Sequence, residues 1–112
     1  MKFSGLVLAF LFSANGLYSQ WTTKSELPAL GRNHPVTFTI DGNGYTFTGY
    51  YTLSASYTDD GYKYDPGTNT WKALSRFKGG IRGFAVGASY NGKGYLGFGR
   101  DINEIKKRAY SY

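Results

Sequence analysis

The sequence contains no cysteine and only one histidine, His34. The absence of cysteine excludes disulfide scaffolds, thiolate zinc sites and cysteine nucleophiles. A single histidine excludes most metal sites with two imidazole ligands and leaves a serine triad only one possible base. No apolar run reaches the about 18 residues that a membrane-spanning helix needs. Because only three prolines are present and 41% of the residues are hydrophobic, the composition is that of a folded chain.

The N-terminus has the features of a secretory signal peptide, predicted over residues 1–19. Lys2 supplies the positive charge, residues 5–12 (GLVLAFLF) form a short apolar core, and small polar residues follow. The sequence ANG at 14–16 best fits the small-x-small cleavage rule, whereas cleavage before Gln20 would leave about 93 residues. An N-terminal core strand is the alternative. We expect an exported protein that is periplasmic, on the cell surface or secreted, without a membrane span.

Charge is divided unevenly along the rest of the chain. Residues 21–71 carry three basic and five acidic side chains, whereas residues 72–112 carry nine basic and two acidic ones. A basic half can bind nucleic acid or an anionic surface. Export and the lack of a base-reading motif exclude nucleic acid as an expected partner, so we expect a solvated basic face.

An internal repeat organises the chain after residue 20. Residues 21–49 align with residues 71–99 without a gap, and eight of the 29 aligned positions are identical. About two identities are expected by chance. The identical positions of the first copy are Trp21, Ser25, Arg32, Val36, Gly42, Gly44, Tyr45 and Gly49. These residue types indicate a repeated unit of strands and turns.

The first copy predicts a four-stranded antiparallel meander of about fifty residues. Its first strand alternates apolar residues with threonine (PVTFTI), so one face is buried. Asp41-Gly42-Asn43-Gly44 supplies the positive-φ residues of a tight hairpin turn, and Asp65-Pro66-Gly67-Thr68-Asn69 makes another turn. The expected strands are residues 35–40, 45–51, 57–64 and 70–74.

The second copy repeats this opening with strands over residues 83–90 and 95–99. Residues 101–109 are ambiguous, because Asp101 and Glu104 could form a helical capping box. The repeat favours a third strand from about residue 107 instead. Residues 110–112 (YSY) then match residues 62–64 (YKY), with a preceding loop two residues shorter.

These residues resemble the kelch-repeat β-propellers over residues 21–112. The matching features are an arginine before the first strand, a Gly-x-Gly-Tyr turn, a Tyr-Asp-Pro step and a Thr-Asn-Thr-Trp segment. The family's paired glycines after strand two are reduced here to Gly49 and Gly99, which follow Thr48 and Phe98. The resemblance implies an exported, bacterial-style protein of the galactose-oxidase-like propeller type. The implied fold is all-β, with four-stranded antiparallel meander blades of a kelch-type β-propeller.

The resemblance gives each repeated residue a structural role. The tryptophans are expected to pack between neighbouring blades, and the arginines to pair with a carboxylate or strand carbonyl of an adjacent blade. The glycines allow turns and close backbone approach. The positions concerned are Trp21, Arg32, Gly42, Gly44, Tyr45, Gly49, Tyr64, Asp65, Pro66, Asn69, Trp71, Arg82, Gly92, Gly94, Tyr95 and Gly99.

The order of the motifs predicts an incomplete propeller over residues 20–112. Residues 21–27 are expected to be the closing strand of a last blade, because Trp21 stands where a fourth strand carries its tryptophan. Blade 1 spans about residues 32–74, and a partial blade 2 spans about residues 82–112. Because a propeller needs roughly four to eight blades, we expect an N-terminal fragment of a longer protein. A ring assembled from several short chains is the alternative.

Candidate chemistry is sparse. Asp41, Asn43 and Gly44 superficially resemble a calcium loop, but the twelfth position is Thr52, so a turn is favoured. Asp59 and Asp60 could hold a cation or act as an acid–base pair, although solvated or arginine-paired carboxylates are favoured. No nucleophile elbow, phosphate loop or dinucleotide fingerprint is present, so no catalytic, metal-binding or cofactor-binding residue and no cofactor is expected.

The expected function is binding rather than catalysis. Loops and exposed tyrosines could contact a protein or glycan, and the candidate contacts at the ligand face are His34, Tyr50, Tyr51 and Tyr57. The main hypothesis is a non-catalytic interaction or carbohydrate-recognition propeller that is not an enzyme. The alternative is a fragment of a sugar-active kelch enzyme, similar to a sialic-acid mutarotase, with its active residues in missing blades.

Overall fold

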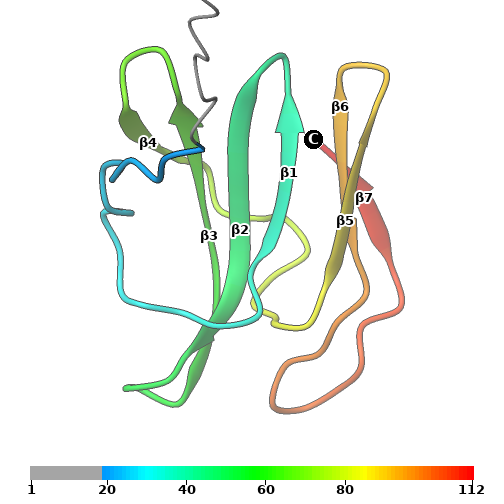
Figure 1. Cartoon of the computed structure of the whole chain (residues 1–112). Helices are drawn as coiled ribbons and strands as arrows, with labels where there is room; N and C mark the ends of the chain where they lie inside the picture. Colours follow the sequence, from blue (N-terminus) through cyan, green and yellow to red (C-terminus); the bar gives the residue numbers. More distant parts are fainter. Residues whose placement is uncertain (1–18) are drawn as a thin grey trace, which may run out of the picture.

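The computed structural model describes residues 19–112, so the predicted signal peptide lies outside the described residues apart from Ser19. Within this range the chain forms seven antiparallel strands and no helix. The strands make a four-stranded sheet and a three-stranded sheet that lie side by side (Figure 1). The fold is therefore all-β and built from meander sheets, as the sequence predicts.

The first sheet is a simple up-and-down meander. It contains β1 (Val36–Ile40), β2 (Asn43–Tyr51), β3 (Ser56–Asp65) and β4 (Thr70–Leu74), paired in chain order. Asp41 and Gly42 form the turn between β1 and β2 with φ angles of 48° and 75°. Positive φ at both positions is typical of a two-residue hairpin turn that matches the twist of the strands. The predicted turn is confirmed, and Asn43 and Gly44 already belong to β2.

The second sheet repeats the first three strands. It contains β5 (Val86–Tyr90), β6 (Lys93–Gly97) and β7 (Ala109–Ser111). Leu96 pairs with Tyr110 here, as Thr46 pairs with Tyr62 in the first sheet. This register confirms that Tyr110 corresponds to Tyr62 and that the preceding loop is two residues shorter. The predicted third strand is present, although it begins at Ala109 and not near residue 107.

The fifty-residue repeat is also visible in the backbone angles. Left-handed φ values recur at His34 and Phe84 (51° and 57°) and at Thr48 and Phe98 (62° and 61°). Thr48 also forms a β-bulge, since the register between β2 and β3 shifts between Phe47 and Gly49. Residues other than glycine rarely adopt a left-handed backbone conformation, and β-branched residues such as threonine do so least readily. The position where kelch repeats carry the first of two glycines thus keeps a glycine-like backbone without the glycine.

The core forms where β1 meets the second sheet. The buried hydrophobic residues are Val36, Phe38, Phe47 and Leu96. The alternation predicted for β1 is confirmed, because Val36 and Phe38 are buried while Thr37 and Thr39 are exposed. Close approach of the two sheets depends on glycine: a Cβ atom on Gly94 would lie 2.1 Å from the Phe38 ring.

The second sheet leaves large apolar side chains in solvent. Val86 of β5 is 60% exposed, and Tyr90 at the end of the same strand is 76% exposed. All five residues of β5 are exposed, although the strand contacts β1 on one side (Figure 1). Packing between the two sheets therefore covers only part of the apolar surface of this unit.

The segment before β1 forms no strand with the described blades, and its role as the closing strand of a last blade stays a prediction. Residues 21–27 form no strand, and Trp21 is fully exposed, so it packs against no neighbouring blade within the described chain. The segment is anchored to the turn before β4: the Ser25 backbone N–H donates to Asn69 Oδ1 at 3.0 Å, and its hydroxyl donates to the Asn69 carbonyl at 2.7 Å.

Trp71 lies between its own sheet and the N-terminal segment. Its indole N–H donates to the Ser25 carbonyl at 2.9 Å, and its ring lies 5.0 Å from that of Tyr64 on the adjacent strand. It therefore packs against its own sheet and the anchored N-terminal segment. Half-buried aromatic rings with a polar atom favour such positions, because the indole N–H needs an acceptor.

Candidate functional site

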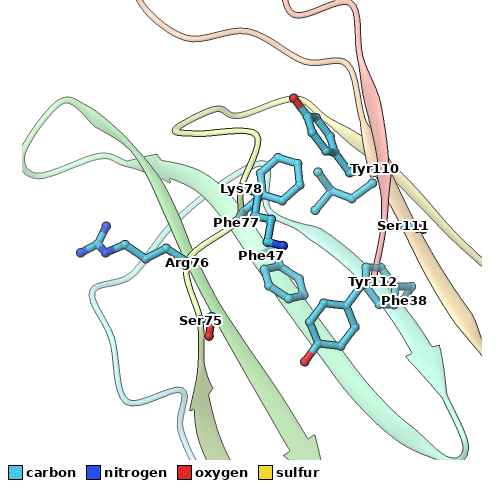
Figure 2. A pocket seen from close by; sticks show the side chains of 10 residues that line it. Phe38, Phe47, Ser75, Arg76, Phe77, Lys78, Tyr110, Ser111 and Tyr112 are labelled. Carbon is cyan, nitrogen blue, oxygen red and sulfur yellow. The ribbon is translucent and has the colours of Figure 1, made fainter.

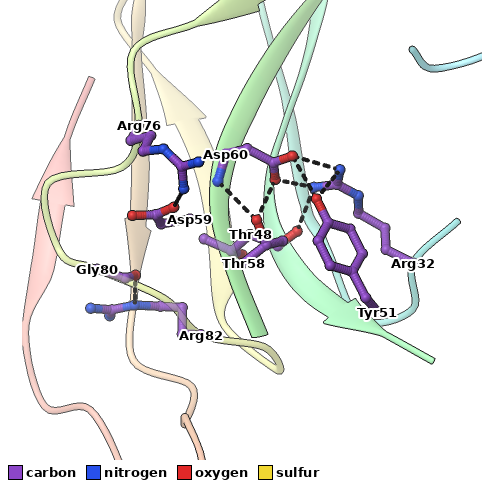
Figure 3. A network of polar contacts seen from close by, with 9 residues as sticks. All are labelled: Arg32, Thr48, Tyr51, Thr58, Asp59, Asp60, Arg76, Gly80 and Arg82. Carbon is purple, nitrogen blue, oxygen red and sulfur yellow. Dashed lines mark hydrogen bonds and ion pairs between the residues drawn. The ribbon is translucent and has the colours of Figure 1, made fainter. Parts of the chain in front are cut away.

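The polar centre of the first unit is an arginine–aspartate pair (Figure 3). Arg32 precedes β1 and Asp60 lies on β3; Arg32 Nη1 donates to Asp60 Oδ1 at 2.5 Å and Nη2 donates to Oδ2 at 2.9 Å. Tyr51 at the end of β2 donates to Asp60 Oδ2 at 2.7 Å, and the Thr58 hydroxyl donates to Oδ1 at 2.8 Å. Arg32 also donates to the Thr48 carbonyl at 3.1 Å. Each carboxylate oxygen therefore accepts two hydrogen bonds.

This network fixes the charge of Asp60. Burial alone would raise the pKa of the carboxyl, but the hydrogen bonds from Arg32, Tyr51 and Thr58 outweigh it and lower the pKa to about 2. The Arg32 side chain is 3% exposed, and although burial opposes its charge, Asp60 raises the guanidinium pKa. A carboxylate that stays ionised and has its acceptors filled cannot serve as a proton donor or acceptor near neutral pH. The pair therefore has a structural role, because it holds the segment before β1 against β3.

The neighbouring Asp59 is held separately. β3 places consecutive side chains on opposite faces, so Asp59 points away from Asp60 and pairs with Arg76 after β4 (Figure 3). Of the two favoured states, solvated or arginine-paired, the structure shows the arginine-paired one for both carboxylates. An acid–base pair made of these two residues is excluded, because each faces a different cation on a different side of the sheet.

The pKa of Asp60 predicts acid sensitivity of the fold. A carboxyl whose pKa falls from 3.8 to about 2 on folding adds stability that is complete above the unfolded pKa and lost as pH falls. At about 1.4 kcal/mol per pKa unit, Asp60 contributes about 2 kcal/mol at pH 6 that has largely gone at pH 2. Urea unfolding midpoints between pH 6 and pH 2 measure this loss.

The control is the Asp60→Asn variant, whose unfolding midpoint should depend less on pH over the same range. Some dependence will remain, because Lys106 and the backbone N–H groups of Asn103 and Glu104 also lower the pKa of Asp101 to about 2. An unchanged pH slope in Asp60→Asn would contradict the assignment.

The equivalent arginine of the second unit has no carboxylate partner among residues 19–112. Arg82 is 1% exposed; Nη1 donates to the Phe98 carbonyl at 3.0 Å, and Nη2 donates to the Gly79 carbonyl. Its guanidinium also lies 4.8 Å from the centre of the Phe77 ring. Both arginines thus bind groups of their own unit, and not of an adjacent blade as expected. Each arginine side chain points back to the end of the second strand of its own unit, where it donates to the carbonyl of Thr48 or Phe98.

The candidate ligand contacts lie at one end of the first sheet, where Asn33, next to His34, forms a backbone bridge with Tyr50, and Tyr50 pairs with Tyr57. His34 stacks on Phe84 with ring centres 3.9 Å apart, and Tyr50 packs edge-on against Tyr57 at 5.0 Å. Tyr51 is committed to the Asp60 network. The His34–Phe84 stack joins repeat-equivalent positions, which the sequence comparison aligns without indicating that they touch.

The remaining repeated positions form turns and strand faces. Asp65 Oδ1 accepts the Gly67 N–H at 2.8 Å and so closes the turn with Pro66. Gly92 has a φ of 72° in the second hairpin turn and repeats the Gly42 turn. Tyr45 lies on β2, and its ring stacks 5.6 Å from that of Phe38. Tyr95 occupies the same position on β6 and is 39% exposed.

A cavity of about 270 Å³ lies between the two sheets (Figure 2). Phe38, Phe47 and Leu96 form its core side, and Phe77, Tyr110 and Tyr112 close it from the connecting segment and the last strand. No carboxylate or histidine lines it. Its aromatic and aliphatic core side suits packing or an apolar group, while Arg76 and Lys78 make one edge of the lining basic.

Residues 19–112 contain no group of three or more histidine, cysteine or acidic side chains arranged to hold a metal. In the same residues, no helix has the length and apolar character to cross a membrane. The described part of the chain therefore supplies a folded scaffold with two buried arginines as its main polar features.

Comparison with known proteins finds relatives of this chain in sequence and in structure. No family model matches the chain. It is 33% identical over 102 residues to the N-acetylneuraminate epimerases of Escherichia coli strain K12 and Escherichia coli O157:H7, covering 79% of this chain and 27% of each relative. It also matches the solved structure of YjhT with a TM-score of 0.69 and 30% sequence identity, over 80% of this chain and 26% of that one. The chain thus spans about a quarter of its relatives' length.

These relatives are named as enzymes. The expectation that the protein is not an enzyme is therefore wrong, since its similarity is to proteins named for an epimerase activity. The predicted fold class, antiparallel meander blades of a kelch-type propeller, is confirmed by the similarity to YjhT. The alternative hypothesis, a fragment of a sugar-active kelch enzyme similar to a sialic-acid mutarotase, agrees with these relatives better than the non-catalytic main hypothesis does.

Proposed function

We propose that this chain supplies blades of a kelch-type β-propeller that acts on the sugar acid N-acetylneuraminate and interconverts its anomers. The observation that carries the proposal is the 33% identity to N-acetylneuraminate epimerases over 102 residues. The match to YjhT at a TM-score of 0.69 supports a common arrangement of the strands. In this proposal, the chain and these relatives share the kelch-type motifs around Arg32, Gly44 and Trp71.

The contribution of these blades is positioning and packing. Anomer interconversion breaks the bond between the anomeric carbon and the ring oxygen; a base removes the proton of the anomeric hydroxyl while an acid protonates the ring oxygen. Asp59 and Asp60 are both ion-paired, so they do not serve as this acid and base. The proposal therefore assigns proton transfer to other blades of the assembled propeller.

The proposal also includes export and a partner surface. The signal-peptide pattern of residues 1–19 supports a location in the periplasm, on the cell surface or outside the cell, and the proposal gives the protein a sugar acid and not a nucleic acid as its ligand there. The exposed apolar side chains of β5, such as Val86, need a covering surface. Further blades or a second copy of the chain would supply that surface and close a ring.

A chimera tests the proposal directly. Residues 21–112 replace the matching quarter of the Escherichia coli K12 epimerase, and nuclear magnetic resonance follows the conversion of fresh α-N-acetylneuraminate to the β anomer. We expect conversion well above the uncatalysed rate, because the grafted blades preserve the packing that positions the active residues.

The isolated chain is the matched control, and it should leave the uncatalysed rate unchanged. A chimera that folds by circular dichroism but does not accelerate conversion would overturn the proposal. Acceleration by the isolated chain would overturn the assignment of proton transfer to other blades.

A further inference from the structure

The two units differ at the position that neutralises the buried arginine. On β3, Asp60 immediately precedes Gly61, which pairs with Phe47; in the second sheet Arg108 immediately precedes Ala109, which pairs with Gly97. The registers make Arg108 the counterpart of Asp60. The second unit therefore carries a cation where the first carries the carboxylate that binds its arginine.

This replacement leaves Arg82 buried and without a directly paired carboxylate in the part of the chain that the structure describes; Asp101, which pairs with Lys106, acts on Arg82 only through longer-range charge attraction. Backbone carbonyls of Gly79, Gly80 and Phe98 accept its hydrogen bonds, but these groups carry no net charge. Burial lowers the pKa of its guanidinium, in contrast to Arg32, whose pKa is raised. A buried charge without a counter-ion is costly, which favours an anion from outside the chain.

A cavity of about 390 Å³ opens beside Arg82. Its lining residues are Gly79, Arg82, Glu104, Ile105, Lys106, Lys107, Arg108 and Tyr110. Glu104 and Asp101 engage Lys106, whereas Lys107 and Arg108 are exposed and form no ion pair within residues 19–112. The volume lies within the about 300–1,000 Å³ typical of small-molecule sites. The cavity thus combines a buried cation, two free cations and adequate space.

We propose that this cavity binds the carboxylate group of a small acidic ligand, which takes the place beside Arg82 that the Asp60 carboxylate holds beside Arg32. The planar guanidinium of Arg82 binds the carboxylate oxygens from the inner wall. Arg108 and Lys107 contribute from the rim, and the Tyr110 ring forms one side. For the choice of N-acetylneuraminate as the ligand, the inference rests on the proposed function.

The test titrates N-acetylneuraminate into the full chain and follows the side-chain Nε–Hε resonance of Arg82 together with the melting temperature. The methyl ester of the same sugar is the matched neutral probe, and acetate reports the carboxylate alone. We expect the acid and acetate to shift the Arg82 resonance, and the acid to raise the melting temperature by about 5 °C at ten times its Kd. The ester should do neither.

The Arg108→Asp variant supplies an internal carboxylate at the Asp60 position. We expect a higher melting temperature without ligand and at least a tenfold loss of affinity for the acid. Lys93→Asp, at the far hairpin of the same sheet, makes the same change in charge and should bind as the unaltered chain does.

Equal responses to the acid and the ester, no response to any probe, or unchanged binding in Arg108→Asp would each overturn the site. A response to acetate with none to the acid would overturn the sugar acid as ligand. These readouts need no anomer interconversion, so a failed chimera leaves them separate from the proposed function.

Discussion

Replacement of Asp60 by asparagine should lower the free energy of unfolding by about 3 kcal/mol, because it leaves the Arg32 charge buried without its counter-ion. Asparagine keeps the size of the side chain, so the loss reports charge and hydrogen bonding rather than a cavity. The Arg32 side chain is 3% exposed, and water cannot replace the lost carboxylate oxygen. Urea unfolding at pH 7 measures the change.

The adjacent aspartate provides the control for this prediction. Asp59 pairs with Arg76, whose side chain is 74% exposed, so Asp59→Asn should cost less than about 0.5 kcal/mol. The two variants remove the same charge from neighbouring positions of β3. Equal losses in both would show that net charge, and not the buried pair, governs the stability of the first unit.

Replacement of Gly94 by alanine should destabilise the packing of the two sheets by about 1–3 kcal/mol. The new Cβ would lie 2.1 Å from the Phe38 ring, which is 7% exposed and also stacks near Tyr45 and Phe47. The ring cannot move aside without disturbing the rest of the core. A lower melting temperature, measured by circular dichroism, is the expected result.

Gly44 is the repeat-equivalent control, since it occupies the same position of the Gly-x-Gly-Tyr motif. A Cβ there would meet only the Tyr64 Cβ at 3.7 Å, an ordinary contact, so Gly44→Ala should change stability by no more than about 0.5 kcal/mol. If the two alanine variants were equally destabilised, the motif glycine would be required by the strand itself and not by the neighbouring sheet.

Local patterns in the sequence predicted most of the strands. The alternation in residues 36–40 and the Asp41-Gly42 turn depend on interactions within a few residues, and the structure reproduces both. The repeat resolved the ambiguous residues 101–109, because it transferred the third strand of the first unit onto β7. Periodicity and turn chemistry were sufficient wherever the partner of a strand was its neighbour in the chain.

Interactions between distant segments were not predictable in the same way. The hydrogen bond from the Ser25 backbone to the Asn69 side chain, 44 residues further along the chain, was not predicted. The bulge at Thr48 was also missed, although the absence of the family's first glycine at this position was a visible signal. Both outcomes depend on side-chain hydrogen bonds or backbone strain that no local pattern records.

The candidate site was predicted only in part. Pairing of Asp60 with an arginine was among the expectations, but the sequence did not show that Arg32 is the partner or that Tyr51 is part of the network. The substitution of Arg108 for Asp60 was readable from the repeat. Its meaning required the structure, which shows that the burial of Arg82 persists without the carboxylate.

The backbone around Arg82 has a consequence for how the protein is made. The Arg82 N–H donates to the Thr58 carbonyl at 3.2 Å, and its carbonyl accepts the Gly49 N–H at 2.8 Å. The entry to the second unit is thus fastened to β2 and β3, which must already be paired to present these groups. The N-terminal unit leaves the ribosome first, so β2 and β3 are available before Arg82 and the second unit emerge. The first unit can therefore fold before the second and then bind the backbone of Arg82.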